Sequence, residues 1–159
     1  MYMKNLLYLF FLCESFLGVA SCRPEEDETH HYKIHVENDW SKGVFIDYSC
    51  SKYDTIYTTN GSFDPEECLL PDKTTHLSIG SRTTWENFFS RPDNDTLHMY
   101  LLDAESVFTR LDKSLLVRYD LSLQDLRCLD WQITFPPTEE MKDIHMWPSY
   151  DAVVQKYQD

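Results

Sequence analysis

Basic residues are scarce in this 159-residue chain, which has 14 lysines and arginines against 27 aspartates and glutamates and a formal net charge of -13. A protein that binds a phosphate backbone needs a basic surface, so this composition argues against nucleic acid as a partner. The same acidity argues against a domain surface that lies flat on anionic lipid.

Glycine is scarce as well, with four residues in the whole chain, and no glycine-rich phosphate loop is present. No serine stands in a nucleophile elbow, no cysteine pair has zinc-site spacing, and no motif predicts a cofactor. The sequence therefore predicts a protein that is not an enzyme. A small cysteine hydrolase is the less favoured alternative, with Cys128 and His145 as the pair to test.

Three histidines near the start of the folded part, His30, His31 and His35, invite a metal interpretation. The surrounding residues alternate with the period of a strand. In a strand, His31 and His35 would stand about 13 Å apart, too far to share one ion. No metal site is predicted.

Long apolar runs are missing except near the N-terminus, where residues 6–12 read LLYLFFL after Lys4. A membrane-spanning helix needs about 20 apolar residues, whereas this run has the length of a signal-peptide core. Residues 19–22, VASC, resemble a bacterial lipobox, whose cysteine is acylated and becomes the first mature residue. The sequence predicts a lipoprotein signal peptide at 1–21 and a diacylated Cys22, with an ordinary cleaved secretory signal as the alternative.

Residues 22–31 form an acidic, apolar-poor segment that should act as a solvated tether. An acidic cluster after a lipidated cysteine resembles the signal that sends some lipoproteins to the outer face of the outer membrane. We expect an outer-membrane lipoprotein of the cell envelope, and both the surface-exposed and the inward-facing orientation stay open.

Three cysteines remain after the lipobox. Cys50 and Cys68 flank a turn-rich stretch, and a bridge between them would stabilise the fold by about 3 kcal/mol. Free thiols are the competing interpretation. Cys128 stands beside the leucines of a short helical stripe, so we expect a buried, inert thiol.

Residues 32–159 have the length and pattern of a single β-rich domain. Residues 115–121 alternate as a strand, Ser122 and Asp125 predict a capped short helix, and residues 131–135 alternate again. Residues 32–37 and 44–48 predict a hairpin. We expect a mainly β fold, an immunoglobulin-like or related β-sandwich with one or two short helices. The predicted core comprises Ile34, Val36, Val44, Ile46, Leu97, Met99, Leu101, Val117, Tyr119, Trp131 and Ile133.

The sequences RYDLSLQDL at 118–126 and WQITFPP at 131–137 resemble a family of small uncharacterised lipoproteins from Gram-negative gut anaerobes. The resemblance implies a lipid anchor and carries no activity. Residues 54–56 (DTI) and 95–97 (DTL) resemble the O-glycosylation signal of envelope proteins from the same bacteria, which makes Thr55 and Thr96 candidate modification sites.

The sequence predicts a membrane-anchored envelope module that binds a protein or a glycan and catalyses nothing. A fimbrial or adhesin-type structural subunit is the alternative. Aromatic side chains that could stack on sugars or anchor a protein contact are Trp40, Tyr53, Tyr57, Trp147 and Tyr150.

Overall fold

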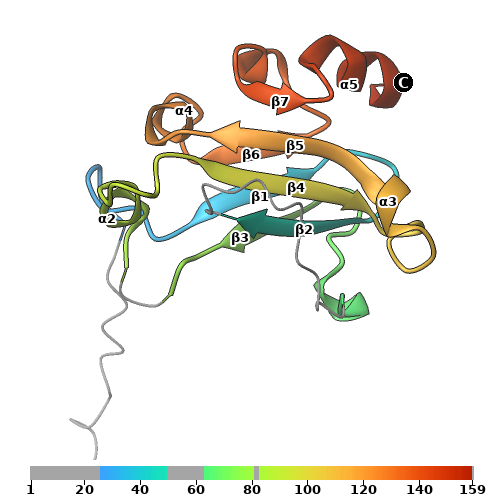
Figure 1. Ribbon diagram of the computed structural model, residues 1–159, viewed down its shortest axis with the longest axis horizontal. Helices are drawn as coiled ribbons and strands as arrows, with labels where there is room; N and C mark the ends of the chain where they lie inside the picture. The colour runs from blue at the N-terminus through green and yellow to red at the C-terminus, as the bar shows by residue number, and fades with distance from the viewer. Residues whose placement is uncertain (1–25, 50–62, 81–82, 159) are drawn as a thin grey trace, which may run out of the picture.

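The computed structural model describes residues 26–49, 63–80 and 83–158, and within these ranges seven strands form two sheets in a sandwich-like arrangement (Figure 1). The smaller sheet has the strand order β3-β1-β6, and the larger has the order β2-β4-β5-β7. The prediction of a mainly β protein is confirmed at this level. The strands are β1 (Ile34–Asn38), β2 (Val44–Ser49), β3 (Lys73–Leu77), β4 (Leu97–Asp103), β5 (Leu115–Leu121), β6 (Gln132–Phe135) and β7 (His145–Trp147).

The two sheets differ in the relative direction of their paired strands. In the smaller sheet, β1 pairs antiparallel with β3 and parallel with β6, so that Val36 lies opposite Ile133. The larger sheet is antiparallel throughout, and β4 lies between β2 and β5. Strand β4 is therefore internal to this sheet. Its side chains are mostly buried on both faces, because the apolar cluster around Tyr100 covers the face that points away from the main core.

The predicted hairpin between residues 32–37 and 44–48 is wrong, because β1 and β2 belong to different sheets. The buried side chain of Asn38 holds the crossover between them. Its amide donates to the carbonyl oxygens of Lys42 and Leu69 at 2.8 and 3.0 Å, and its Oδ1 accepts from the Trp40 N–H at 3.1 Å. A turn signal followed by a second alternating run does not say which sheet the second strand joins.

The core lies between the sheets and includes residues of both. Tyr119 of β5 is fully buried, and its hydroxyl donates to the carbonyl oxygen of Thr134 in β6 at 3.2 Å. Burial raises the pKa of the Tyr119 hydroxyl, so it stays a donor. Ten of the eleven predicted core residues are buried, and the eleventh, Ile46, is partly buried and packs against the same cluster.

Short helices occupy the ends of the sheets. α2 (Trp85–Phe89) and α4 (Leu123–Cys128) lie together at one end, and α3 (Leu111–Ser114) lies at the other (Figure 1). The described ranges hold four α-helices, where one or two were predicted, because helices of one or two turns leave little periodicity in the sequence. The fourth α-helix is α5 (Tyr150–Tyr157). Two short 3₁₀ segments are also present, η1 (Pro65–Glu67) and η2 (Glu139–Met141).

The predicted start of α4 is confirmed in detail. The hydroxyl of Ser122 accepts from the Asp125 N–H at 3.2 Å, and the Asp125 carboxylate accepts from the Ser122 N–H at 2.8 Å. This capping box fixes where α4 begins. Across the described ranges, none of the helices combines the length and apolar character needed to cross a bilayer.

Candidate functional site

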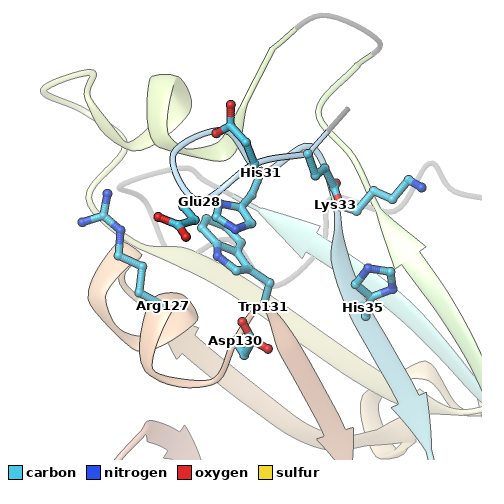
Figure 2. Close-up of a pocket in the computed structure, with 9 residues that line it drawn as sticks. Glu28, His31, Lys33, His35, Arg127, Asp130 and Trp131 are labelled. Atoms are coloured by element: carbon cyan, nitrogen blue, oxygen red, sulfur yellow. The ribbon is translucent and has the colours of Figure 1, made fainter. Parts of the chain in front are cut away.

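A hollow of about 660 Å³ opens where the segment before β1 meets the junction between α4 and β6 (Figure 2). One wall comes from residues 26–35 and the other from residues 127–131. The lining combines charges of both signs with two imidazoles and one indole. It consists of Glu26, Asp27, Glu28, His31, Lys33, His35, Arg127, Asp130 and Trp131.

Trp131 is placed by a left-handed turn of the backbone after α4. Asp130 and Trp131 have φ values of 49° and 61°, a region that costs a residue other than glycine roughly 1–2 kcal/mol. The Trp131 N–H donates to the Leu126 carbonyl at 2.8 Å, which closes the turn and directs the indole inward, where it is 4% exposed. Burial of so large a side chain offsets the strain. Strained backbone of this kind tends to occur at functional sites.

The imidazole of His31 is held on one ring face and at one ring nitrogen. Its ring stacks on the Trp131 indole with centroids 4.2 Å apart and planes 15° apart. Its Nδ1 lies 2.6 Å from Glu86 Oε1, and its backbone N–H donates to Glu86 Oε2 at 3.1 Å. The His31 carbonyl accepts from the Trp85 N–H at 2.8 Å, which ties the hollow to α2.

The contact with Glu86 decides which ring nitrogen of His31 carries the hydrogen. Burial alone would raise the pKa of Glu86, but the hydrogen bonds from the ring and backbone of His31 outweigh it and lower the pKa below 4.5. An ionised carboxylate only accepts hydrogen bonds, so Nδ1 of His31 donates to Glu86. No residue in the described ranges bonds to the other ring nitrogen, Nε2.

The charged residues of the hollow fall into two groups. Glu26 and Asp27 are engaged within their own segment: Glu26 accepts from the Tyr32 N–H at 3.0 Å, and hydrogen bonds from Thr29 and His30 lower the pKa of Asp27 to about 2. The other four make no ion pair within the part of the chain that the structure describes. They are two acids and two bases, Glu28, Asp130, Lys33 and Arg127.

A second polar cluster lies on the outer face of the larger sheet. Asp120 of β5 pairs with His98 of β4 and His145 of β7, each Nδ1 lying 2.6 Å from a carboxylate oxygen, and Arg118 Nε lies 2.9 Å away. Burial alone would raise the pKa of Asp120, but the two histidine hydrogen bonds and the Arg118 charge outweigh it and lower that pKa. With the Asp120 side chain 10% exposed, this cluster joins three strands and leaves little carboxylate surface for a ligand.

The predicted modification sites lie largely outside the described ranges. Cys22, Cys50 and Thr55 are outside them, so lipidation and the Cys50–Cys68 bridge stay predictions. Cys68 is partly buried just after η1, and burial raises the pKa of its thiol. Thr96 is half-buried immediately before β4.

The expectation of a buried Cys128 is wrong. Cys128 is exposed at the last residue of α4, because Leu126 and Leu129 take the core positions of this helix. Its sulfur accepts from the Gln124 side chain at 3.3 Å, and His145 bonds to Asp120. The structure therefore shows no contact between Cys128 and His145.

The aromatic residues singled out from the sequence have different environments. Trp147 is 60% exposed, as expected for a contact residue. Trp40 is instead half-buried against Phe135 and Tyr157, at ring centroid distances of 5.7 and 5.3 Å. Tyr150 is half-buried against the main core, and Tyr53 and Tyr57 lie outside the described ranges.

The sequence draws attention to Trp131 and His31 separately but does not predict that they line one hollow. The sequence pattern places Trp131 on a strand face and His31 in a group of histidines that invites a metal interpretation. Within the described ranges no group of three histidines, cysteines or acids is arranged to hold a metal ion. Glu86 lies 55 residues from His31, and no local pattern signals that contact.

The chain matches no protein-family model, no curated protein and no solved structure.

Proposed function

We propose that this protein is an envelope lipoprotein anchored in the outer membrane through a diacylated Cys22, and that its domain is a non-enzymatic module that binds a glycan or another envelope protein. The lipobox-like VASC sequence and the acidic segment after it support the anchor. Two or three acyl chains anchor a protein durably where one does not.

The hollow around Trp131 and His31 is the observation that carries the binding part of this proposal. It is the place where strained backbone, a fixed imidazole and uncompensated charges coincide. Binding sites are concave and largely preformed, with a few polar groups in set positions. The stack on Trp131 and the contacts with Glu86 fix His31 in advance.

We also propose the immunoglobulin-like or related build for the sandwich. Two facing sheets of three and four strands over one core support it. The parallel pairing of β1 with β6 departs from the two antiparallel sheets of the immunoglobulin fold itself, so of the two alternatives it favours a related build.

Anchoring is tested by fractionation of cells that express the wild-type chain or Cys22→Ala. We expect the wild-type chain in the membrane fraction, with the acyl mass found on Cys22 by mass spectrometry. The variant should move to the soluble fraction. A Cys22→Ala protein that still partitions with membranes would contradict the anchor.

Binding is tested with the full chain purified in detergent, on a glycan array and in pull-downs from envelope fractions. We expect saturable binding that survives Cys128→Ala and is weakened by changes to the hollow. Turnover of a substrate that disappears with Cys128→Ala would support the hydrolase alternative and overturn the module.

A further inference from the structure

We propose that a second cavity of the domain, which we call the Trp40 pocket, binds a neutral sugar. It has a volume of about 380 Å³ and is lined by three segments, residues 39–41, 71–72 and 156–157. It shares no lining residue with the hollow around Trp131, so this inference goes beyond the binding proposed at that hollow. A cavity of this size lies near the lower end of the range for ligand sites, roughly 300–1,000 Å³.

The walls of the Trp40 pocket are held in place by the buried side chain and backbone of Asn38. Its side-chain oxygen accepts from the Trp40 N–H at 3.1 Å, and its carbonyl accepts from the Asp72 N–H at 2.8 Å. Asp39 is held as well, since its N–H donates to the Phe135 carbonyl at 2.7 Å. The loop after β1 and the loop before β3 are therefore fixed against each other before any ligand arrives, as in most small-molecule sites.

Two aromatic side chains line the pocket, Trp40 and Tyr157. Their rings pack edge to face with centroids 5.3 Å apart, and both contact the fully buried Phe135, at 5.7 and 5.3 Å. Each of the two is only partly buried, so part of its ring is accessible. A sugar presents C–H groups that can pack on such a ring. A ring that is already held against the core loses little conformational freedom when a ligand covers it.

Two lysine ammonium groups lie over these rings. Lys42 Nζ is 5.8 Å from the centroid of the Trp40 ring, and Lys156 Nζ is 4.8 Å from that of Tyr157. Exposed contacts of this kind contribute only about 0.5–1 kcal/mol, and the lysine stem is flexible. A sugar can therefore displace Lys156 from the ring and still accept a hydrogen bond from its ammonium group.

The polar groups around the rings favour a ligand without net charge. Asp39 and Asp72 are acceptors, whereas Ser41 and Lys156 can donate. All four are exposed, and their side chains make no ion pair or hydrogen bond with another residue of the described ranges. Sugar hydroxyls both donate and accept, so a neutral sugar can use all four groups. An anion is repelled by the two carboxylates, and a cation leaves Lys156 without a partner.

The test measures the binding of tetrasaccharides by calorimetry, with the full chain in detergent at pH 7. The neutral probes are tetramers of glucose, mannose and N-acetylglucosamine, and the charged probes are the glucosamine tetramer and tetragalacturonate. We expect at least one neutral tetramer to bind with a Kd of about 1 mM or lower, and about tenfold tighter than either charged probe. Added salt should change the affinity of a neutral ligand little.

Variants locate the sugar in the Trp40 pocket. Asp39→Asn and Asp72→Asn keep the shape of the side chain, and asparagine tolerates the positive φ of 54° at position 72. We expect each to weaken binding about threefold to tenfold, because a hydrogen bond to a charged group is stronger than one to a neutral group. Asp93→Asn is the matched control, an exposed aspartate outside both cavities, and should change nothing. Trp40→Ala should abolish binding, and the two aspartate variants, which keep the packing of the rings, do not depend on how that variant folds.

The outcomes separate this inference from the proposed function. Equal or tighter binding of a charged tetramer overturns the neutral-sugar assignment, and so does the absence of binding by every neutral tetramer. An equal loss in Asp93→Asn and in the variants of the pocket overturns it as well. Neutral-sugar binding that persists in the variants of the pocket but is lost in Asp130→Asn overturns the Trp40 pocket and supports binding at the hollow around Trp131. No saturable binding of any glycan or envelope protein overturns both.

Discussion

The imidazole of His31 lies flat on the indole of Trp131, with ring centroids 4.2 Å apart and ring planes 15° apart. Trp131 is itself a member of the main core cluster. The wall of the hollow is therefore continuous with the densely packed interior, where side chains have little freedom to move. A substitution in the core near Trp131 should therefore change the position of the His31 ring, so one variant can test both residues.

Replacement of Trp131 with alanine should lower the free energy of unfolding by about 3–5 kcal/mol, because it removes a large buried side chain. Urea denaturation followed by circular dichroism measures this change. Trp147→Ala is the matched control, since Trp147 is 60% exposed and its removal should cost less than about 0.5 kcal/mol. Equal losses in the two variants would show that Trp131 is not part of the core.

Replacement of Asp120 with asparagine should destabilise the fold by about 3 kcal/mol, because it leaves a mostly buried Arg118 and two histidines without their shared carboxylate. The comparison is Lys42→Ala, which breaks the exposed pair between Lys42 and Glu105 and should cost much less, because solvent screens that pair. Thermal unfolding at neutral pH measures both. A small loss in Asp120→Asn would mean that the cluster is not needed to hold β4, β5 and β7 together.

Stability should fall as the pH is lowered below about 4.5. Glu86 and Asp120 have pKa values in the folded chain below their ordinary values of 4.5 and 3.8, so the unfolded chain takes up protons first. Their stabilisation is fully present above the unfolded pKa values and is lost as the pH falls through the folded ones. Urea midpoints between pH 7 and pH 3 measure this slope.

The variants of the acid groups should change that slope in opposite directions. Glu86→Gln and Asp120→Asn should make it shallower. Asp47→Asn should make it steeper, because burial raises the pKa of Asp47 and this group favours the folded state in acid. Parallel pH profiles for all four proteins would contradict the assignment of these shifts.

Removal of the Ser122 hydroxyl by Ser122→Ala should cost about 1 kcal/mol, the usual value of an N-cap. Ser149 offers the control within the same chain, because it precedes α5 without a side-chain cap hydrogen bond. Ser149→Ala should therefore leave the unfolding midpoint nearly unchanged. A reversal of this order would show that the capping box does not define the start of α4.

Local patterns predicted much of this fold. The alternation around Val117 and Tyr119 identified β5, and Ser122 with Asp125 located the first turn of α4. Strand β4 has apolar side chains on both faces, which is typical of a central strand. Each of these features depends on neighbours within a few residues, and such neighbours are visible in the sequence.

Features that depend on distant contacts were not predictable. The side-chain amide of Asn38 bonds to a carbonyl 31 residues away, and this contact makes the turn after β1 a change of sheet. The positive φ values of Asp130 and Trp131 had no signal, since neither residue is glycine. The hollow combines both kinds of feature, because it depends on the turn at Asp130 and on the pairing of β1 with β6.

Glu26 lines the hollow and stands four residues after Cys22, the proposed site of the lipid. A fully extended chain spans at most about 3.6 Å per residue, so this wall of the hollow lies within about 15 Å of the lipidated cysteine. With the proposed lipid on Cys22, the hollow would stay next to the headgroups and would not sample the space tens of ångströms above them. The proposed anchor would therefore restrict the hollow to ligands near the membrane surface, and a flexible insertion between residues 22 and 26 would extend its reach.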